Sequence, residues 1–242
     1  MNDSITRREA IKAIGAAAAA SAAGLAGINA FAANGTTETN MKVLLLNGSP
    51  REHGNTAAML AEIAGQLKKN GVDSEIFWLG NKPVRGCIEC GQCHGKCIFD
   101  DDVCNTVIDR MSECDGLIVG SPVFYGVPAG QVLSLLQRMA FAGGNVLQGK
   151  PAAAITVCRR GGATSEFQAL QMPFQMLNMP IVTSQYWNIA YGGGPGEVSQ
   201  DEEGMQTMRT LADNMAYMLK QLATGTAKAP EREPSKMTNF IR

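Results

Sequence analysis

The fold of this chain is decided by the stretch KVLLLNGSPREHGNT, residues 42–56. It begins with an apolar run over residues 42–46, which is typical of a strand buried on both faces of a parallel sheet. Two glycines then permit sharp turns, and Asn55 or Thr56 could cap a helix predicted over residues 56–70. The start of such a helix has free N–H groups and partial positive charge. The stretch therefore predicts a strand, a phosphate-binding loop and a helix.

The composition of this loop limits which phosphate it could bind. It lacks the Gly-Lys-Ser/Thr ending of nucleoside-triphosphatase loops, and it lacks the GxGxxG pattern of dinucleotide-binding folds. Its donor side chains are Ser49, Arg51, Asn55 and Thr56, and Gly54 lies among them. This set suits a terminal phosphomonoester such as that of FMN. The alternative is an ordinary turn between a strand and a helix.

The first forty residues differ in composition from the remainder. A twin arginine at residues 7–8 precedes an uncharged Ala/Gly-rich run over residues 13–33 that ends with small residues. This pattern is typical of a twin-arginine export signal with cleavage after Ala32, and it predicts an exported, periplasmic protein. The alternative is a membrane anchor formed by the uncleaved run.

The remaining length, about two hundred residues, is sufficient for one well-buried domain. We assign residues 1–40 to the signal and a polar leader, residues 41–224 to the domain, and residues 225–242 to a flexible tail. The formal net charge is −1 and the sequence pI is 6.1, and no basic run stands out. A nucleic-acid partner is therefore not expected.

Strand and helix patterns alternate along the domain. Strands are predicted over residues 42–46, 74–79, 116–120, 152–157 and 181–189, and helices over 56–70, 103–113, 128–140, 165–179 and 201–222. Pro128 suits the first turn of the third helix, where no N–H is needed. The alternation predicts a three-layer, flavodoxin-like α/β fold, with a five-stranded parallel sheet of order 2-1-3-4-5 and helices on both faces.

Two loops follow the third and fourth predicted strands, at the sheet edge where such folds bind ligands. The first loop contains Pro122, Val123, Phe124, Tyr125 and Gly126, and the second contains Cys158, Arg159, Arg160, Gly161 and Gly162. A flat heterocycle could pack on the first loop, and an arginine from the second would stabilise the reduced anion of a flavin. The alternatives are a structural loop covering the core and solvated surface arginines.

These motifs carry a family resemblance over residues 41–222. The chain resembles the flavodoxin-like NAD(P)H-dependent FMN reductases and, within them, the iron–sulfur flavoprotein branch. The resemblance rests on segments 48–56, 121–126, 184–188 and 201–206, and on the cysteine cluster that leads into residues 100–102. It implies that Ser49, Arg51, Asn55 and Thr56 bind the FMN phosphate and that residues 122–126 contact the ring. It also implies a homodimer or homotetramer with the flavin near a subunit boundary.

Seven cysteines are present, and four of them form the pattern CxxCxxCxxxC: Cys87, Cys90, Cys93 and Cys97. Thiolates at this spacing can surround one [4Fe–4S] cluster. The iron–sulfur flavoproteins usually have a longer gap before the fourth cysteine, so Cys104 is an alternative to Cys97. Structural or disulfide-forming cysteines and a structural zinc site are the other interpretations.

Together these features predict an exported FMN-dependent oxidoreductase that transfers electrons through FMN and a [4Fe–4S] cluster. The expected donor is a redox partner protein, a quinol or NAD(P)H, and the expected acceptor is a small molecule. The alternatives are a non-catalytic electron carrier and a flavin-free binding protein. The sequence assigns no general acid, although Tyr125, Tyr186 and Arg159 are candidates. Hydrolase motifs such as GxSxG and HExxH are missing.

Overall fold

The computed structural model describes residues 41–228 and residue 233. The predicted export signal at residues 1–40 and most of the predicted tail lie outside the described residues, so both stay predictions. The last helix, α7 (Glu202–Thr224), ends where the predicted domain ends. Within the described ranges no helix combines the length and apolar character needed to cross a bilayer.

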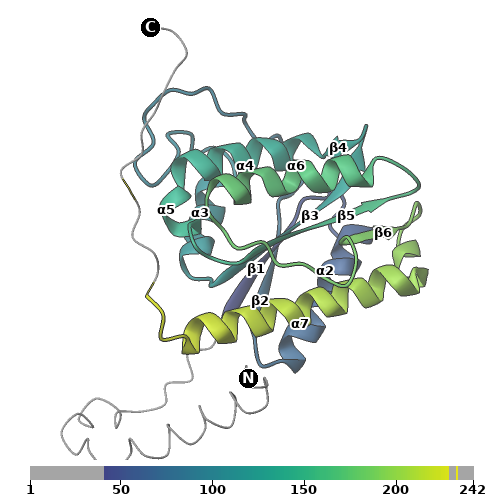
Figure 1. Ribbon diagram of the computed structural model, residues 1–242. Helices are drawn as coiled ribbons and strands as arrows, with labels where there is room; N and C mark the ends of the chain where they lie inside the picture. Colours follow the sequence, from purple (N-terminus) through teal and green to yellow (C-terminus); the bar gives the residue numbers. More distant parts are fainter. Residues whose placement is uncertain (1–40, 229–232, 234–242) are drawn as a thin grey trace, which may run out of the picture. The chain divides into compact units, whose positions relative to one another are not determined.

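The centre of the domain is a parallel sheet. Its strands are β1 (Lys42–Asn47), β2 (Asp73–Trp78), β3 (Gly116–Phe124), β5 (Ala152–Cys158) and β6 (Ile189–Tyr191). They are paired in the order β2-β1-β3-β5-β6, and every one of these pairs is parallel (Figure 1). The predicted three-layer fold and the predicted strand order are confirmed.

Helices cover both faces of this sheet (Figure 1). One face carries α2 (Asn55–Lys69) and α7, and the other carries α3 (Cys104–Ser112), α4 (Gly130–Ala142), α5 (Gly144–Leu147) and α6 (Ala163–Met176). Val43 and Leu45 of β1 pack in the first core, whereas Leu44 and Leu46 pack in the second. Successive strand side chains point to opposite faces. The continuous apolar run of β1 therefore supplies both cores.

The predicted fifth strand, residues 181–189, is wrong over most of its length. Ile181 makes one isolated parallel bridge with Ala152, and regular pairing resumes only in β6. Between them the Ser184 hydroxyl donates to the Thr207 carbonyl oxygen at 2.7 Å, and the Gln185 side-chain oxygen accepts the Thr210 hydroxyl at 3.0 Å. These residues contact α7, and regular strand pairing is interrupted over residues 182–188.

The loop predicted after the third strand is the end of a β-hairpin. β3 continues to Phe124 and pairs antiparallel with the short strand β4 (Val127–Pro128). Tyr125 and Gly126 join them with φ of 53° and 81°, as a two-residue hairpin turn with left-handed backbone requires. Pro128 is therefore in a strand, where an edge position tolerates its missing N–H. The prediction that it starts a helix is wrong, because α4 begins at Gly130.

Candidate functional site

A cavity of about 300 Å³ lies at the carboxyl ends of β1, β3 and β5. The predicted cofactor-binding residues that line it are Ser49, Arg51, Gly54, Asn55, Thr56, Pro122, Val123, Phe124 and Arg159. Three segments that are distant in the sequence thus meet at one edge of the sheet. Ligands of open parallel sheets bind at this edge.

The loop after β1 is held in place by its own side chains and by β2. The Asn47 side-chain amide donates to the Glu52 carbonyl oxygen at 3.0 Å, and its oxygen accepts the Ser49 backbone N–H at 3.1 Å. The Trp78 indole N–H donates to the Ser49 carbonyl oxygen at 2.9 Å. The loop is therefore preorganised around the start of α2. Asn47 and Trp78 were not among the predicted site residues.

The N-cap of α2 is Gly54, which makes no side-chain capping bond, so the prediction that Asn55 or Thr56 caps this helix is wrong. Asn55 instead binds a distant segment. Its amide nitrogen donates to the Gly194 carbonyl oxygen at 3.0 Å, and its oxygen accepts the Val198 N–H at 3.4 Å. The side chain therefore ties the phosphate loop to the segment after β6.

That segment forms a wall of the cavity that the sequence prediction missed. Gly192, Gly193 and Pro195 line the cavity beside Arg159. A Cβ atom on Gly192 would lie 2.7 Å from the Val198 nitrogen, and one on Gly193 would lie 3.0 Å from the Arg159 Cγ. The available signal was the run Gly192-Gly193-Gly194-Pro195 directly after a strand, because glycines at a strand end permit close approach.

Thr56 carries an unpaired polar atom in this cavity. Its side chain is 1% exposed, and its hydroxyl has no hydrogen-bond partner in the structure. Buried hydroxyl groups are ordinarily paired, and an unpaired one loses free energy. A phosphate oxygen would pair this hydroxyl at the positive end of α2 and beside Arg51. The residues present therefore fit a phosphomonoester.

Four predicted residues do not line the cavity: Tyr125, Gly126, Gly161 and Gly162. Tyr125 is fully exposed at the hairpin turn. Gly162 has φ of +87°, and a Cβ atom on it would lie 2.9 Å from the Gly126 Cα. The Ser165 hydroxyl also donates to the Gly126 carbonyl oxygen at 2.6 Å. These contacts hold the hairpin against the start of α6, so two of these glycines support the cavity wall from behind.

A second cavity, of about 280 Å³, is lined by the four thiols of Cys87, Cys90, Cys93 and Cys97. It lies in the segment of residues 79–103, which has no regular secondary structure. Cys104 does not line this cavity. It is the first residue of α3 and is fully buried in the core, and burial raises the pKa of its thiol to about 12. The first four cysteines therefore line one cavity, whereas Cys104 is outside its lining, although Cys97 and Cys93 are close enough to act on the Cys104 thiol.

Arg138 of α4 connects the cysteine segment to the helical layer. Its side chain is fully buried, and its Nε donates to the Cys97 sulfur at 3.3 Å. The guanidinium also donates to the Phe99 and Arg85 carbonyl oxygens, at 3.0 and 3.2 Å, and pairs with Asp102. Burial acts to lower the pKa of Arg138, but the bonds to Asp102 and Cys97 raise it overall, so the group stays charged.

Arg138 was missed by the sequence prediction, although the pattern contains a signal. It stands on the apolar face of α4, among Val132, Leu135, Leu136 and Met139. A charged residue at such a position is rarely buried without a partner. The arginine therefore indicated a buried polar contact, but its partners could not be named from the sequence.

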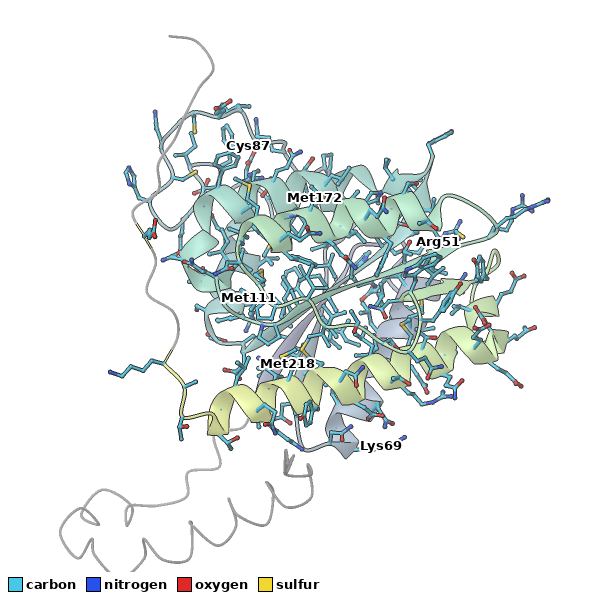
Figure 2. All side chains as sticks on the ribbon, in the orientation of Figure 1. Arg51, Lys69, Cys87, Met111, Met172 and Met218 are labelled. Atoms are coloured by element: carbon cyan, nitrogen blue, oxygen red, sulfur yellow. The ribbon has the colours of Figure 1, made fainter. Side chains whose placement is uncertain are left out.

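The donor set of the second cavity is four thiols, which is the set that [4Fe–4S] clusters use. Within residues 41–228 and 233, no group of three or more His, Cys, Asp or Glu side chains is arranged to hold a metal ion, and all seven cysteines are free. The cluster, zinc and disulfide interpretations stay predictions. Figure 2 shows Cys87 and Arg51 well apart, so the two cavities are separate sites.

Solved structures share this architecture. RosB with bound 8-demethyl-8-formylriboflavin-5′-phosphate aligns with a TM-score of 0.61 at 14% identity, covering 84% of this chain and 92% of RosB. A flavodoxin from the domain Archaea aligns with a TM-score of 0.50 at 15% identity, covering 74% of this chain and 99% of the flavodoxin. At these identities the likeness shows the fold alone.

Sequence comparison identifies the family. An iron–sulfur flavoprotein of Methanocaldococcus jannaschii is 32% identical over 192 residues, which cover 74% of this chain and 98% of the relative. The model of the NADPH-dependent FMN reductase family matches residues 41–194, a range that includes the phosphate loop, the hairpin and the cysteine segment. Both findings support FMN as the cofactor and flavin-dependent oxidoreduction as the activity. The chain therefore belongs to the NADPH-dependent FMN reductase family.

Proposed function

We propose that the protein binds FMN in the 300 Å³ cavity and acts as an oxidoreductase that transfers electrons through it. The observation that carries this proposal is the buried Thr56 hydroxyl, which has no partner and lies at the start of α2 inside the phosphate loop. A bound phosphomonoester would pair this hydroxyl. The match to the FMN reductase family over the same loop supports the choice of FMN.

Different residues of the cavity would bind different parts of FMN. Ser49, Arg51, Asn55 and Thr56 would hold the phosphate, with the free N–H groups of α2 adding partial positive charge. Pro122, Val123 and Phe124 would present an apolar surface to the ring. Arg159 would place a cation beside the polar edge of the ring and favour its negatively charged reduced state. Bound FMN supplies hydride acceptance and single-electron release.

We propose that Cys87, Cys90, Cys93 and Cys97 hold a [4Fe–4S] cluster. Their shared cavity and uniform thiol chemistry support this set over one that includes Cys104. The relative from M. jannaschii is named an iron–sulfur flavoprotein, which supports the same assignment. Four thiolates around a cubane each bind a different iron, so they need to surround one space and not one point.

We also propose that the chain is exported to the periplasm and takes electrons from a redox partner protein or a quinol. The support is the twin-arginine pattern at residues 7–8, because NAD(P)H is a cytoplasmic pool. Fusing residues 1–40 to a reporter tests export, and retention in the cytoplasm would remove this assignment.

Rapid turnover of the purified protein with NADPH would overturn the proposed donor. Sedimentation would test the homodimer or homotetramer.

The experiment that tests the cofactors is an absorption spectrum of anaerobically purified protein, with flavin and iron counted per chain. Flavin bands over a broad shoulder, with about four irons per chain, are expected. Flavin without iron would overturn the cluster and keep the FMN site. A colourless protein that takes up no FMN would overturn the proposed function. Reversible reduction without turnover on any small acceptor would favour an electron carrier.

A further inference from the structure

Glu166 is a carboxyl group buried under the FMN cavity. It lies in the first turn of α6 and is 0% exposed. Among the residues that the structure describes, it is the only acidic side chain in the fully buried set. A buried carboxylate is costly unless it is paired with a cation or well hydrogen-bonded. The surroundings of Glu166 therefore decide its protonation state.

The partners of this carboxyl are hydroxyl groups. Oε2 is hydrogen-bonded to the Thr156 hydroxyl of β5, and the Ser121 hydroxyl of β3 also interacts with the group. The second oxygen, Oε1, has no partner, and neither does the Oδ1 atom of Asn188, a buried residue that directly precedes β6. No described ion pair includes Glu166. The group is thus incompletely satisfied.

The charged and titratable groups around Glu166 are few. From β5 the Cys158 thiol faces it, and burial raises the pKa of that thiol, so it is neutral at physiological pH. β3 contributes only the Ser121 hydroxyl, and no described charged side chain of β4, β6 or α4 acts on the carboxyl. Burial raises the pKa of Glu166 to about 8, although the Thr156 and Ser121 hydroxyls act to lower it.

The position of the carboxyl links it to the cavity. Its partners Ser121 and Thr156 are each followed by a residue that lines the cavity, Pro122 and Val157 respectively. The Cys158 thiol, which interacts with the carboxyl, itself lines the cavity. Glu166 therefore lies next to residues of the cavity wall. In such a poorly solvated layer, charge added to the cavity acts strongly on a neighbouring ionisable group.

We propose that Glu166 is a redox-linked proton acceptor, which takes up a proton from solvent when the bound flavin gains negative charge. This inference rests on the proposed function, because it requires FMN in the cavity. Glu166 is a positioning residue and not a catalytic residue, since it acts through its charge. If Glu166 is already protonated before reduction, the protein takes up one proton with the two electrons that reduce FMN. If Glu166 is ionised before reduction, the protein takes up two protons with the two electrons. One proton goes to the flavin and the other to Glu166.

The test is a spectroelectrochemical titration of bound FMN across pH, which measures protons taken up per two electrons. The native protein is expected to change from one proton to two above about pH 8. Glu166→Gln is expected to keep one proton throughout. Glu113→Gln, an exposed position that follows α3 at the far end of β3, is the control and should match the native protein. Equal slopes for native protein and Glu166→Gln would overturn the inference.

A second variant keeps the test decisive if Glu166→Gln fails to fold. Thr156→Val removes a hydroxyl that lowers the pKa of Glu166, so the change from one proton to two should move to higher pH. An unmoved transition in this variant would also overturn the inference. Failure of the native protein to bind FMN would instead overturn the proposed function. Infrared spectroscopy of the flavin-free protein gives a separate readout, because the band of a neutral carboxyl should disappear in Glu166→Gln.

Discussion

The two cavities of this protein are built in different ways. The cavity that we propose for FMN, called the FMN cavity below, is formed by the ends of three parallel strands, whose positions are fixed by the register of β1, β3 and β5. The cysteine cavity lies in an irregular segment, which Arg138 fastens to α4 through Cys97, Phe99, Arg85 and Asp102. The first cavity is held by the sheet, whereas the second is held by side-chain hydrogen bonds from Arg138 and from Asn105 of α3, which bonds to Cys97 and Phe99. Substitutions at the two cavities should therefore have different effects.

The separation of the two cavities makes this difference testable. Arg51 and Cys87 lie far apart in Figure 2, and the two cavities share no lining residue. Changes at distant sites without shared partners usually have additive effects. No variant below should therefore change both the flavin content and the iron content.

The largest effect is expected for Arg138→Met. It removes the guanidinium that anchors the cysteine segment and leaves Asp102 buried without its cation. Breaking a buried ion pair costs about 3–5 kcal/mol. Denaturant unfolding should show this loss, and iron per chain should fall while FMN binding remains.

Arg209→Met is the matched control for this change. Arg209 pairs with Glu62 at 2.6 Å, but both side chains are well exposed, at 41% and 33%. Such surface pairs contribute under about 1 kcal/mol. If Arg138→Met kept full iron and native stability, the anchoring role would be disproved.

Thr56→Val tests the phosphate loop at the other cavity. The valine keeps the shape of the side chain and removes the unpaired hydroxyl, so FMN should bind roughly tenfold to a hundredfold more weakly, as expected for about 1.5–3 kcal/mol from a bond to a charged group. The flavin-free protein should be as stable or more stable, because a buried unsatisfied group is lost. Fluorescence titration with FMN measures the affinity. The exposed Thr183→Val is the control, and unchanged affinity in Thr56→Val would contradict the phosphate assignment.

The contributions of the two regions to the free energy of unfolding should change with pH in opposite directions. Burial raises the pKa of Glu166 to about 8, so folding takes up a proton, and stability should fall as pH rises from the ordinary carboxyl pKa towards 8. The maximal slope is about 1.4 kcal/mol per pH unit. Burial acts to raise the pKa of Asp102, but the bond to Arg138 lowers it overall. That stabilisation is present above the ordinary pKa and is lost in acid.

Denaturant titrations at several pH values separate the two contributions. Glu166→Gln should flatten the decline on the alkaline side, and Asp102→Asn should flatten the decline on the acid side. If the stability of Glu166→Gln depended on pH as that of the native protein does, this carboxyl would not cause the decline in stability on the alkaline side.

The smallest effect on stability is expected within the cysteines. Cys104→Ala removes a sulfur atom from the packed core and should cost about 1 kcal/mol, with iron per chain unchanged. Cys97→Ala, at a partly exposed position, should cost less stability and lose iron. Iron analysis beside thermal unfolding checks both variants. Retention of iron in Cys97→Ala and its loss in Cys104→Ala would reverse the ligand assignment.

Several features were predictable because they depend on local pattern. The apolar run of β1, the alternation of strands and helices, and the phosphate loop at residues 48–56 follow from periodicity and from the chirality of parallel connections. The predicted edge strand failed where Ser184 and Gln185 bond to α7, and Pro128 was misplaced because hairpin pairing overrode its preference for a helix start.

What the sequence by itself determined is the fold class, the strand order and the residues that line most of the FMN cavity. Only the tertiary structure decided the contacts between distant residues. Asn55 binds Gly194 across 139 positions, and Arg138 binds Cys97 across 41. Glu166 owes its burial to the layer between α6 and the sheet. Periodicity shows which face of an element is buried, but the partner that a buried polar group meets depends on how the elements pack.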